Sequence, residues 1–383
     1  MANSISVQPA TTHQDIEEFV RFPFRLYRND PNWVSPLLSE RRAYLDSKRN
    51  PFFEHATVML WLARQNGRVV GTISGHIDHL HNRTHDEKTG MFGFLETVND
   101  YAVAEALLSA ARDWVRAQGM SSLRGPLSFS TNAEVGLLID GIPGPPMVLM
   151  PYNPPYYGEF LARFGLAKVM DVYAYVADLA QFHGKADNLP EKLVRVTERM
   201  KQRAGLVTRT VNMKDFDQEL HRAKTVYNQA WQKNWGFVPM TDAEIEKMAE
   251  DLKQIIDPKL ALFVEADGQP VGVSVCLPDA NQVLKHLKGR LFPIGWAKAL
   301  WYSRKVDGAR LMILGVTETF RGRGVEAVLM FETVRSAILS GYTTVEFSWI
   351  LETNEMMNRI IENVGGPYGA HVYRTYRIYE QPV

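Results

Sequence analysis

The chain has 383 residues, of which 45% are apolar and 22% are charged, and this is the composition of an ordinary folded protein rather than a disordered or fibrous one. Its 43 Lys and Arg residues equal its 43 Asp and Glu residues, so the total charge gives no reason to expect nucleic acid or an anionic membrane as a partner. The length is enough for two domains with separate cores.

The N-terminal residues show no basic stretch followed by an apolar one, and no run approaches the roughly 20 apolar residues that a membrane span needs. We therefore expect a cytoplasmic protein without a membrane span. The single cysteine, Cys276, lies in the apolar run 271–277. This position favours a buried core thiol over a nucleophile.

In chain order, each half of the sequence reads as a strand, one or two helices, a hairpin, a strand, a helix, a strand, a helix and a closing hairpin. Strands that alternate with helices in this way predict an α/β fold, with a mixed sheet covered by helices on both faces. The predicted strands and hairpins are Ile5–Gln8, Thr57–Ile77 and Ser122–Phe129 in the first half, and Val207–Val211, Leu260–Leu277 and Thr344–Ile350 in the second.

The two halves are related by an internal repeat. A shift of 222 positions lays residues 92–132 over residues 314–354, and eight of the 41 aligned pairs are identical. Usual residue frequencies would give about two or three identities. The hairpin signal Asn66-Gly67 likewise lies over Asp267-Gly268. We interpret the chain as a tandem duplication.

Changes in the alignment shift locate two insertions, one within residues 136–155 and the other within residues 279–308. A basic helical stretch after Pro190 reads as a connector between the halves. The predicted domains are residues 1–180 and 206–383, joined by a connecting helix within residues 181–205.

A glycine-rich turn follows the predicted strand 310–316 and precedes an apolar helical pattern. Such a turn directs main-chain N–H groups into one concavity, and the positive end of the following helix adds to it. Two arginines beside the glycines suit a phosphate or diphosphate. The residues predicted to bind the cofactor here are Arg321, Gly322, Arg323, Gly324 and Val325.

The aligned turn of the first half has neither glycine nor cation, and it reads Asn99-Asp-Tyr-Ala. We therefore expect no phosphate to bind there. The first half is interpreted as a degenerate copy, and the second as the half that keeps the cofactor loop. A carboxylate of Glu326 lying in the hollow of that loop would contradict this interpretation.

The turn resembles the acyl-CoA loop of the GNAT acyltransferase superfamily, in which Arg or Gln is followed at +3 by Gly and at +5 by Gly or Ala. Arg321 and Gly324 fit this pattern, whereas Glu326 stands where a small residue is usual. The order of elements is also similar to GNAT over nearly the whole chain. The resemblance implies two tandem GNAT-like domains, acetyl-CoA or a longer acyl-CoA as co-substrate, and no metal.

The resemblance also implies roles for residues around the loop. A main-chain N–H near Val316 would stabilise the oxyanion, and the strand before the loop would part from the next strand. Asn354 would touch the pantetheine arm of CoA, although capping the next helix is an equally good interpretation because Asn132 is its counterpart in the other half.

Acyl transfer from a thioester to an amine needs a base for the ammonium and an acid for the thiolate. The position of the family's usual acid, a Tyr, is held by Ile361, so Tyr373 is our candidate acid, with Tyr376 and Tyr379 as other possibilities. Packing is the alternative for Tyr373. Glu352 is our candidate base, and its alternative is an exposed carboxylate. Glu318 is set aside because its counterpart, Glu96, occurs in the degenerate half.

A stripe of aromatic residues, Tyr227, Trp231 and Trp235, is expected on one helical face. Core packing is the default interpretation of such a stripe. In GNAT-like folds this region covers the acceptor site, so Asn228, Trp231 and Trp235 are the candidate substrate-binding residues. The predicted acceptor is a small-molecule or lipid-like amine bound between the halves.

Two further groups of residues have open interpretations. The histidines of His76-Ile-Asp78-His79-Leu-His81 alternate between strand faces, so no metal site is predicted. Residues 280–306 contain six cations, two tryptophans and no acidic residue. This insertion suits a lid on a CoA phosphate, a helix gripping an acyl chain or membrane surface, or a helix packed at the domain edge.

The sequence therefore predicts an acyl-CoA-dependent N-acyltransferase, monomeric or homodimeric, with no nucleic-acid partner. Stretches such as Trp235-Gly-Phe-Val-Pro resemble an uncharacterised bacterial GNAT-related family. Two alternatives stay open. One is a transferase of the Fem type, which uses aminoacyl-tRNA as donor, and the other is a non-catalytic ligand-binding protein.

Overall fold

The computed structural model describes residues 4–383 and divides into two compact units. Unit 1 comprises the residues up to Val172 together with Leu284–Ala299 and Arg374–Val383, and unit 2 comprises Tyr173–Val283 and Leu300–Tyr373. The last ten residues thus belong to unit 1, although they end the second half of the sequence. The domain boundaries near residues 180 and 205 stay a prediction.

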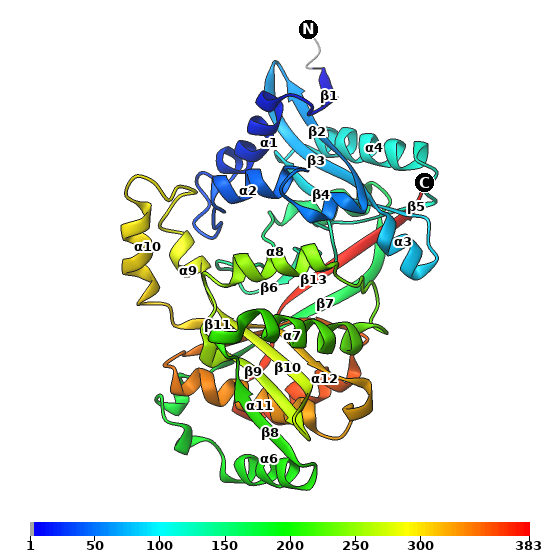
Figure 1. Ribbon diagram of the computed structural model, residues 1–383. Coiled ribbons are helices and arrows are strands. Elements are labelled where there is room, and N and C mark those ends of the chain that lie inside the picture. Colours follow the sequence, from blue (N-terminus) through cyan, green and yellow to red (C-terminus); the bar gives the residue numbers. More distant parts are fainter. Residues whose placement is uncertain (1–3) are drawn as a thin grey trace. The chain divides into compact units, whose positions relative to one another are not determined.

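Unit 1 contains a sheet with the strand order β1-β2-β3-β4-β5-β13, and β6 pairs with β13 (Figure 1). The elements of the first half of the chain are β1 (Ile5–Pro9), α1 (His13–Leu26), α2 (Leu38–Leu45), β2 (Ala56–Gln65), β3 (Arg68–Asp78), α3 (His79–His85), β4 (Thr89–Thr97), α4 (Tyr101–Ala117), β5 (Ser122–Gly125), β6 (Leu137–Gly141), α5 (Tyr156–Arg163) and β7 (Ala167–Asp178).

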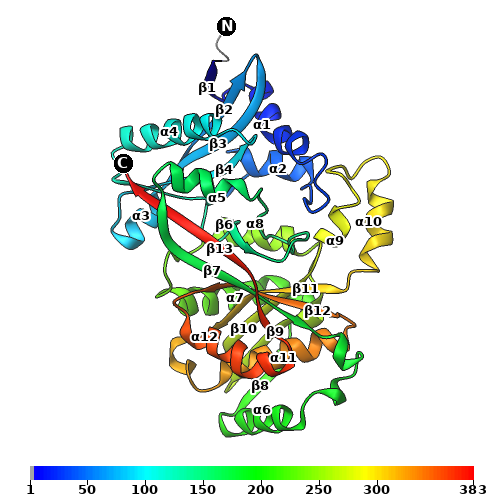
Figure 2. The ribbon, with the colours of Figure 1, turned by 180° about the vertical axis from the view of Figure 1, so that it is seen from behind.

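Unit 2 repeats this plan with the strand order β8-β9-β10-β11-β12-β7. In Figure 1, α7 lies in front of its strands, and in Figure 2, which shows the molecule from behind, α11 lies in front of them. The elements are α6 (Glu191–Arg203), β8 (Leu206–Thr210), α7 (Phe216–Trp231), α8 (Asp242–Leu252), β9 (Ala261–Ala266), β10 (Gln269–Pro278), α9 (Asn281–Leu284), α10 (Gly295–Ser303), β11 (Gly308–Val316), α11 (Val325–Leu339), β12 (Thr344–Leu351), α12 (Glu355–Ile360) and β13 (His371–Pro382).

The two predicted hairpins are confirmed as β2–β3 and β9–β10. Each turns through two residues in the left-handed region, Asn66 and Gly67 at φ 52° and 76°, and Asp267 and Gly268 at φ 49° and 73°. Such turns match the right-handed twist of the flanking strands. The pairs Gln65–Arg68 and Ala266–Gln269 close the hairpins in the same register. The internal repeat is therefore present in the backbone as well as in the sequence.

The predicted closing hairpins are wrong, because each is a single long strand. β7 and β13 each run for 12 residues. The C-terminal strand pairs antiparallel with β5 of unit 1, where Tyr379 lies opposite Gly125. β5 itself is shorter than predicted and ends at Gly125, since Pro126 has no N–H to donate to a ladder. The sixth strand in unit 1 is therefore β13, which ends the second half of the sequence. The sixth strand in unit 2 is β7, which ends the first half.

Each unit has its own hydrophobic core. In unit 1 the apolar face of α4, with Val103, Leu107 and Ala111 fully buried, packs with Ile73 and Phe92 of the sheet. In unit 2, Val325, Val328 and Leu329 of α11 pack with Val264 and Val271. Within residues 4–383 no helix is long and apolar enough to cross a membrane.

Candidate active site

The site predicted in unit 2 lies where β11 and β12 part. The two strands pair in parallel from Gly308 and Thr344 as far as Leu311 and Phe347, and there the pairing stops. β11 nevertheless continues to Val316, which is buried and lies opposite Gly272 of β10. The predicted parting of the two strands is confirmed. The main chain of β11 beyond Leu311 is therefore not paired with β12.

The glycine-rich turn has the predicted backbone shape. Gly322 and Gly324 take φ values of 73° and 87°, a region that only glycine enters at little cost. Gly324 is the N-cap of α11, and no side chain caps this helix from that position. A Cβ added at Gly324 would lie 3.0 Å from the sulfur of Met200 on α6. The helix α6, which the sequence predicted only as a connector, therefore packs against the glycine-rich turn.

The hollow of this turn is taken by a carboxylate of the protein itself. Glu326 is buried, and its Oε1 accepts a hydrogen bond of 3.2 Å from the main-chain N–H of Gly322. This is the arrangement that we expected to contradict the prediction of an open anion cradle. The Gly322 N–H therefore already has an anionic partner that a diphosphate would have to displace, and the binding of a diphosphate at this turn stays a prediction.

The two arginines of the turn play different parts. The guanidinium of Arg321 donates a hydrogen bond of 2.5 Å to the carbonyl of Ala230, near the end of α7. It therefore links the turn to α7. Arg323 is exposed, and its guanidinium carbon lies 5.4 Å from the centre of the Phe320 ring.

Asn354 acts as a helix cap, which is the structural alternative considered for it. Its side chain accepts a hydrogen bond of 3.3 Å from the N–H of Met357 in the first turn of α12. Ile361, which stands in the position of the family's usual acid, is buried. A contact of Asn354 with pantetheine stays a prediction.

Tyr373 belongs to a buried polar cluster on β11 and β12, which we call the Arg310 cluster. Its hydroxyl donates a hydrogen bond to Glu346, and the hydroxyl of Ser348 donates another of 2.5 Å to the same carboxylate. The guanidinium of Arg310 donates to Ser348 at 2.8 Å and lies 3.5 Å from Glu346. Arg310, Glu346 and Ser348 are all buried.

The cluster contains a carboxylate that the sequence did not select. Glu352, our candidate base, is half-buried in the turn after β12, and Asn358 donates a hydrogen bond of 3.4 Å to its carbonyl. Glu346 lies on β12 itself and is the residue that accepts the hydrogen bond of Tyr373. The signal that could have found it is the pairing of Arg310 with Glu346 as neighbours on parallel strands.

The predicted acceptor residues lie on α7 and just after it. Trp231 stacks on Tyr227 with ring centres 4.6 Å apart, and it covers Gly315, where an added Cβ would lie 2.2 Å from the indole. Trp235 is not on the same helical face, because α7 ends at Trp231 and Gly236 turns the chain at φ 66°. That part of the prediction is wrong.

Three buried polar atoms near the parting strands have no hydrogen-bond partner among residues 4–383. They are Oδ1 of Asn228 on α7, Oγ1 of Thr317 just after β11, and Nε1 of Trp349 on β12. Buried polar atoms are nearly always paired, so an orphaned one marks the place of a water or ligand. Asn228 was predicted from the sequence, whereas Thr317 and Trp349 were missed, because an unpaired atom leaves no pattern in a sequence.

The aligned glutamates of the two loops differ in surroundings. Glu318 is exposed, and its ion pair with Lys233 lowers the pKa of its carboxyl group. In unit 1, Oε2 of Glu96 accepts hydrogen bonds from the hydroxyls of Tyr27 and Tyr157, at 2.6 and 2.9 Å. Burial raises the pKa of Glu96 to about 7, against the lowering effect of these two hydrogen bonds. Glu96 therefore keeps its proton to a higher pH than an ordinary glutamate does.

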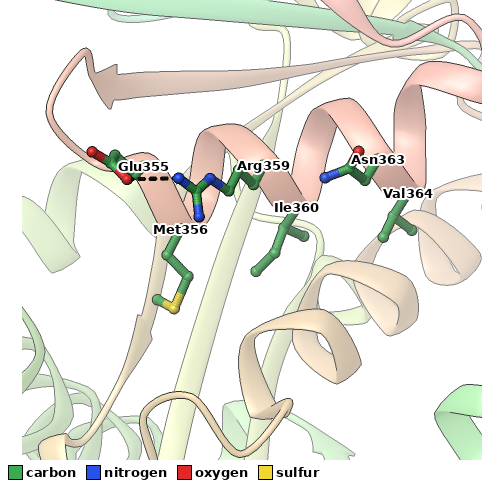
Figure 3. Close-up of a pocket in the computed structure, with 6 residues that line it drawn as sticks. All are labelled: Glu355, Met356, Arg359, Ile360, Asn363 and Val364. Carbon is green, nitrogen blue, oxygen red and sulfur yellow. Dashed lines mark hydrogen bonds and ion pairs between the residues drawn. The ribbon is translucent and has the colours of Figure 1, made fainter.

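A hollow of about 520 Å³ lies along α12 (Figure 3). Met356, Ile360 and Val364 form an apolar row at helical spacing, while Glu355 and Arg359 pair across one turn at 2.9 Å. None of the predicted site residues lines this hollow.

The other expectations concern Cys276 and metals. Cys276 is buried, and burial raises the pKa of its thiol, which suits a core residue. Within residues 4–383 no three His, Cys, Asp or Glu side chains come together as metal ligands. His76 is buried, and its Nε2 donates a hydrogen bond of 2.7 Å to the carbonyl of Phe129, so this ring nitrogen has a structural partner.

The duplicated mixed sheets, the parting strands and the glycine-rich turn define a tandem GNAT fold, and a solved structure has the same fold. A tandem GNAT protein from the clavulanic acid biosynthesis pathway matches with a TM-score of 0.60 over 99% of this chain and 98% of its own, at 14% sequence identity. This identity establishes the fold alone. No family model matches the sequence.

Two relatives are similar over the full length. The chain is 42% identical to a protein named "Bacterial ceramide synthase" from Caulobacter vibrioides, over 98% of this chain and 97% of the relative. It is 34% identical to "Protein YghO" of Escherichia coli, over 100% of this chain and 98% of that protein. The chain belongs to the family of these two proteins, and its fold is that of a tandem GNAT protein.

Proposed function

We propose that the protein is an N-acyltransferase that moves a fatty acyl group from an acyl-CoA thioester to the amine of a lipid-like amino alcohol. The observation that carries this proposal is the 42% identity, over 98% of the chain, to a protein named as a ceramide synthase. A ceramide is the amide of a fatty acid and a long-chain amino alcohol. The GNAT fold fits this reaction, because it belongs to a superfamily of acyltransferases.

The reaction sets the demands on the site. The amine nitrogen attacks the thioester carbonyl carbon, a C–N bond forms and the C–S bond breaks. The amine gives up its proton to a base, and the thiolate that leaves receives one from an acid. The carbonyl oxygen becomes negative on the way and needs a hydrogen-bond donor.

Unit 2 offers groups for each of these tasks. We place the thioester at the point where β11 parts from β12, with the main chain near Val316 toward the oxyanion. Tyr373 is the proposed acid, and its hydroxyl is held in place by Glu346. Glu352, just beyond β12, is the proposed base.

Binding of the substrates rests on the orphaned atoms and on the glycine-rich turn. Asn228 Oδ1 and Thr317 Oγ1 have unused hydrogen-bonding capacity that suits the amine or hydroxyl of an amino alcohol. The turn supplies N–H groups and the cation of Arg323 for the CoA diphosphate. Because Glu326 accepts from Gly322, we propose that its carboxylate swings away when CoA binds.

A direct test incubates the full chain with acyl-CoAs of several chain lengths and a long-chain 2-amino alcohol, and follows the amide by mass spectrometry and the free thiol by a colour reaction. We expect amide and thiol in equal amounts. Tyr373→Phe should lower kcat about 100-fold with little change in KM, as expected for a lost general acid. Tyr379→Phe removes the hydroxyl of another candidate acid on the same strand. Tyr379 belongs to unit 1, so this variant should keep its activity.

The outcomes separate the alternatives. Failure to form any amide, by a folded protein that also binds no acyl-CoA, would remove the enzyme that we propose and leave the ligand-binding alternative. Amide formed only from aminoacyl-tRNA would identify the Fem-type reaction instead.

A further inference from the structure

The segment that precedes and forms α10 carries a group of exposed large apolar side chains, which we call the α10 patch. It consists of Phe292, Ile294, Trp296, Leu300 and Trp301, with exposed fractions of 74, 66, 51, 59 and 60%. Twelve large apolar side chains are exposed among residues 4–383, and five of them lie in these ten positions. Scattered apolar residues are normal on a surface, but a cluster of this kind marks an interaction site.

The helix itself has no buried face. Six of the nine residues of α10 are apolar, yet none of the nine is buried. Trp296 and Leu300 are four positions apart and therefore lie on one side of the helix. A helix with an apolar side normally turns that side toward a core. Here residues 4–383 supply no surface that buries it.

The patch is also not a loose loop, because its base is fixed to unit 1. The carbonyl of Gly289 accepts a hydrogen bond of 3.0 Å from the N–H of Leu38 at the start of α2. Gly289 takes a φ of 76°, and a Cβ there would lie 2.4 Å from the ring of Phe24. Leu287 beside it is buried. The segment is thus anchored at one end while its aromatic residues face outward.

The charged residues of the stretch that contains the patch have one sign. Residues 280–306 contain no Asp or Glu, although the chain as a whole has equal numbers of both charges. The Nζ of Lys305 lies 5.1 Å from the centre of the Trp301 ring, so a positive charge lies next to one of the exposed tryptophans. The cations of this stretch are Lys285, Lys288, Arg290, Lys298, Arg304 and Lys305.

We propose that the α10 patch docks the protein on the surface of an anionic lipid bilayer. Trp and other large apolar side chains insert at the boundary between headgroups and acyl chains, and long basic side chains reach the phosphates. The six cations complement the charge of anionic headgroups. The helix has nine residues and so lies in the interface rather than crossing it. This inference is independent of the proposed acyl transfer.

Vesicle flotation of the full chain tests the proposal. The wild-type protein should float with vesicles of phosphatidylcholine and phosphatidylglycerol, less with phosphatidylcholine alone, and less again at high salt. The double variant Trp296→Ser with Trp301→Ser should bind anionic vesicles about tenfold more weakly. Lys298→Glu with Lys305→Glu should weaken binding to anionic vesicles while leaving the weak binding to neutral ones unchanged.

A matched control is Val207→Ser, because Val207 has a similar exposed fraction of 60% but lies on β8, outside the patch. It should float like the wild type. All of these side chains are exposed, so circular dichroism and thermal unfolding should match for every variant. The proposal is overturned if the wild-type protein ignores anionic vesicles, if the tryptophan variant floats normally, or if the same tryptophans instead mediate self-association or protein binding without any affinity for lipid.

Discussion

The two copies of the strand, loop and helix place the same glutamate in opposite surroundings. Glu96 lies near the end of β4 and is held by two tyrosine hydroxyls, whereas Glu318 lies in a short 3-10 helix after β11, is exposed and pairs with Lys233. The duplication has kept the residue but neither its local backbone conformation nor its partners. An identity between the two copies therefore does not imply a shared role.

The loops that follow these glutamates differ less than their sequences predict. In unit 1, Asp100 caps α4 by accepting a hydrogen bond of 3.0 Å from the N–H of Ala102. In unit 2 the aligned residue is Gly322, and its N–H binds the carboxylate of Glu326 from the first turn of α11. In each loop, therefore, a carboxylate of the same loop or helix accepts a hydrogen bond from a main-chain N–H group. Asp100 does so from the cap position itself, while Glu326 reaches back from within the helix.

The largest expected effect is a loss of stability when the Arg310 cluster is broken. The Arg310 cluster has no copy in unit 1. The residue aligned with Glu346 is Arg124, whose charge is opposite and which pairs with Glu380 at 2.6 Å and Glu87 at 3.1 Å. Arg310→Met would leave Glu346 buried without a cation, and it should lower the free energy of unfolding by about 3–5 kcal/mol.

Urea unfolding measures this effect. Arg310→Met combined with Glu346→Leu removes both charges and should recover most of the lost free energy. If Arg310→Met alone lowers the free energy of unfolding by less than about 1 kcal/mol, which is the loss expected for an exposed ion pair, then this ion pair does not stabilise the cluster.

The second prediction concerns pH. The pKa of Glu96 is raised from 4.5 to about 7, so between these values the folded protein holds a proton that the unfolded chain has released. The free energy of unfolding should therefore fall as the pH rises from 4.5 to about 7 and then level off. Glu96→Gln stays uncharged, keeps an acceptor for Tyr27 and Tyr157, and should remove this fall.

Thermal unfolding at a series of pH values provides the measurement. Glu318→Gln is the control from the aligned position. It should leave the fall between pH 4.5 and about 7 unchanged, because the pKa of Glu318 is lowered from 4.5 and its own effect lies below this window. If Glu96→Gln still loses stability across this window to the same extent as the wild type, another group is responsible.

The third prediction concerns the self-occupied loop. Glu326→Gln removes the negative charge that competes with a diphosphate at the Gly322 N–H, and it should tighten CoA binding about tenfold, or roughly 1.4 kcal/mol. Calorimetric titration of the full chain with CoA measures this. Unchanged or weaker binding would mean that Glu326 does not block the diphosphate. Ala104 is aligned with Glu326, and Ala104→Gln controls for a polar substitution on the other copy of the helix.

The smallest effect is expected at the cap of α4. Asp100→Ala removes the acceptor for the Ala102 N–H and should cost about 1 kcal/mol of unfolding free energy. Asp100→Asn, which keeps a capping oxygen, should cost much less, and equal losses in both variants would argue against capping. Neither substitution should create CoA affinity in unit 1, since no glycine or cation is present in this loop.

The sequence was sufficient to predict those turns whose conformation depends only on neighbouring residues. Asn66-Gly67 and Asp267-Gly268 predict two hairpins because their turn needs left-handed residues, and the glycines at 322 and 324 predict the turn before α11 for the same reason. The boundary of α7 was missed because the aromatic spacing continues past Trp231 after the helix has ended.

Features that depend on distant residues could not be predicted. Three features arise from residues that meet only in the folded chain. They are the hydrogen bond from Tyr373 to Glu346, the pairing of β13 with the sheet of unit 1 and of β7 with the sheet of unit 2, and the raised pKa of Glu96. Glu326 was noticed as a departure from the family pattern, but the sequence could not say that its carboxylate would reach back to Gly322.

The central claim is that one loop of the pair binds CoA and the other does not, and amide hydrogen exchange of the full chain tests it most directly. With saturating CoA, we predict slower exchange at residues 320–326 and no change at residues 98–104. Protection confined to residues 98–104, or no protection of either loop by a ligand that demonstrably binds, would contradict the account.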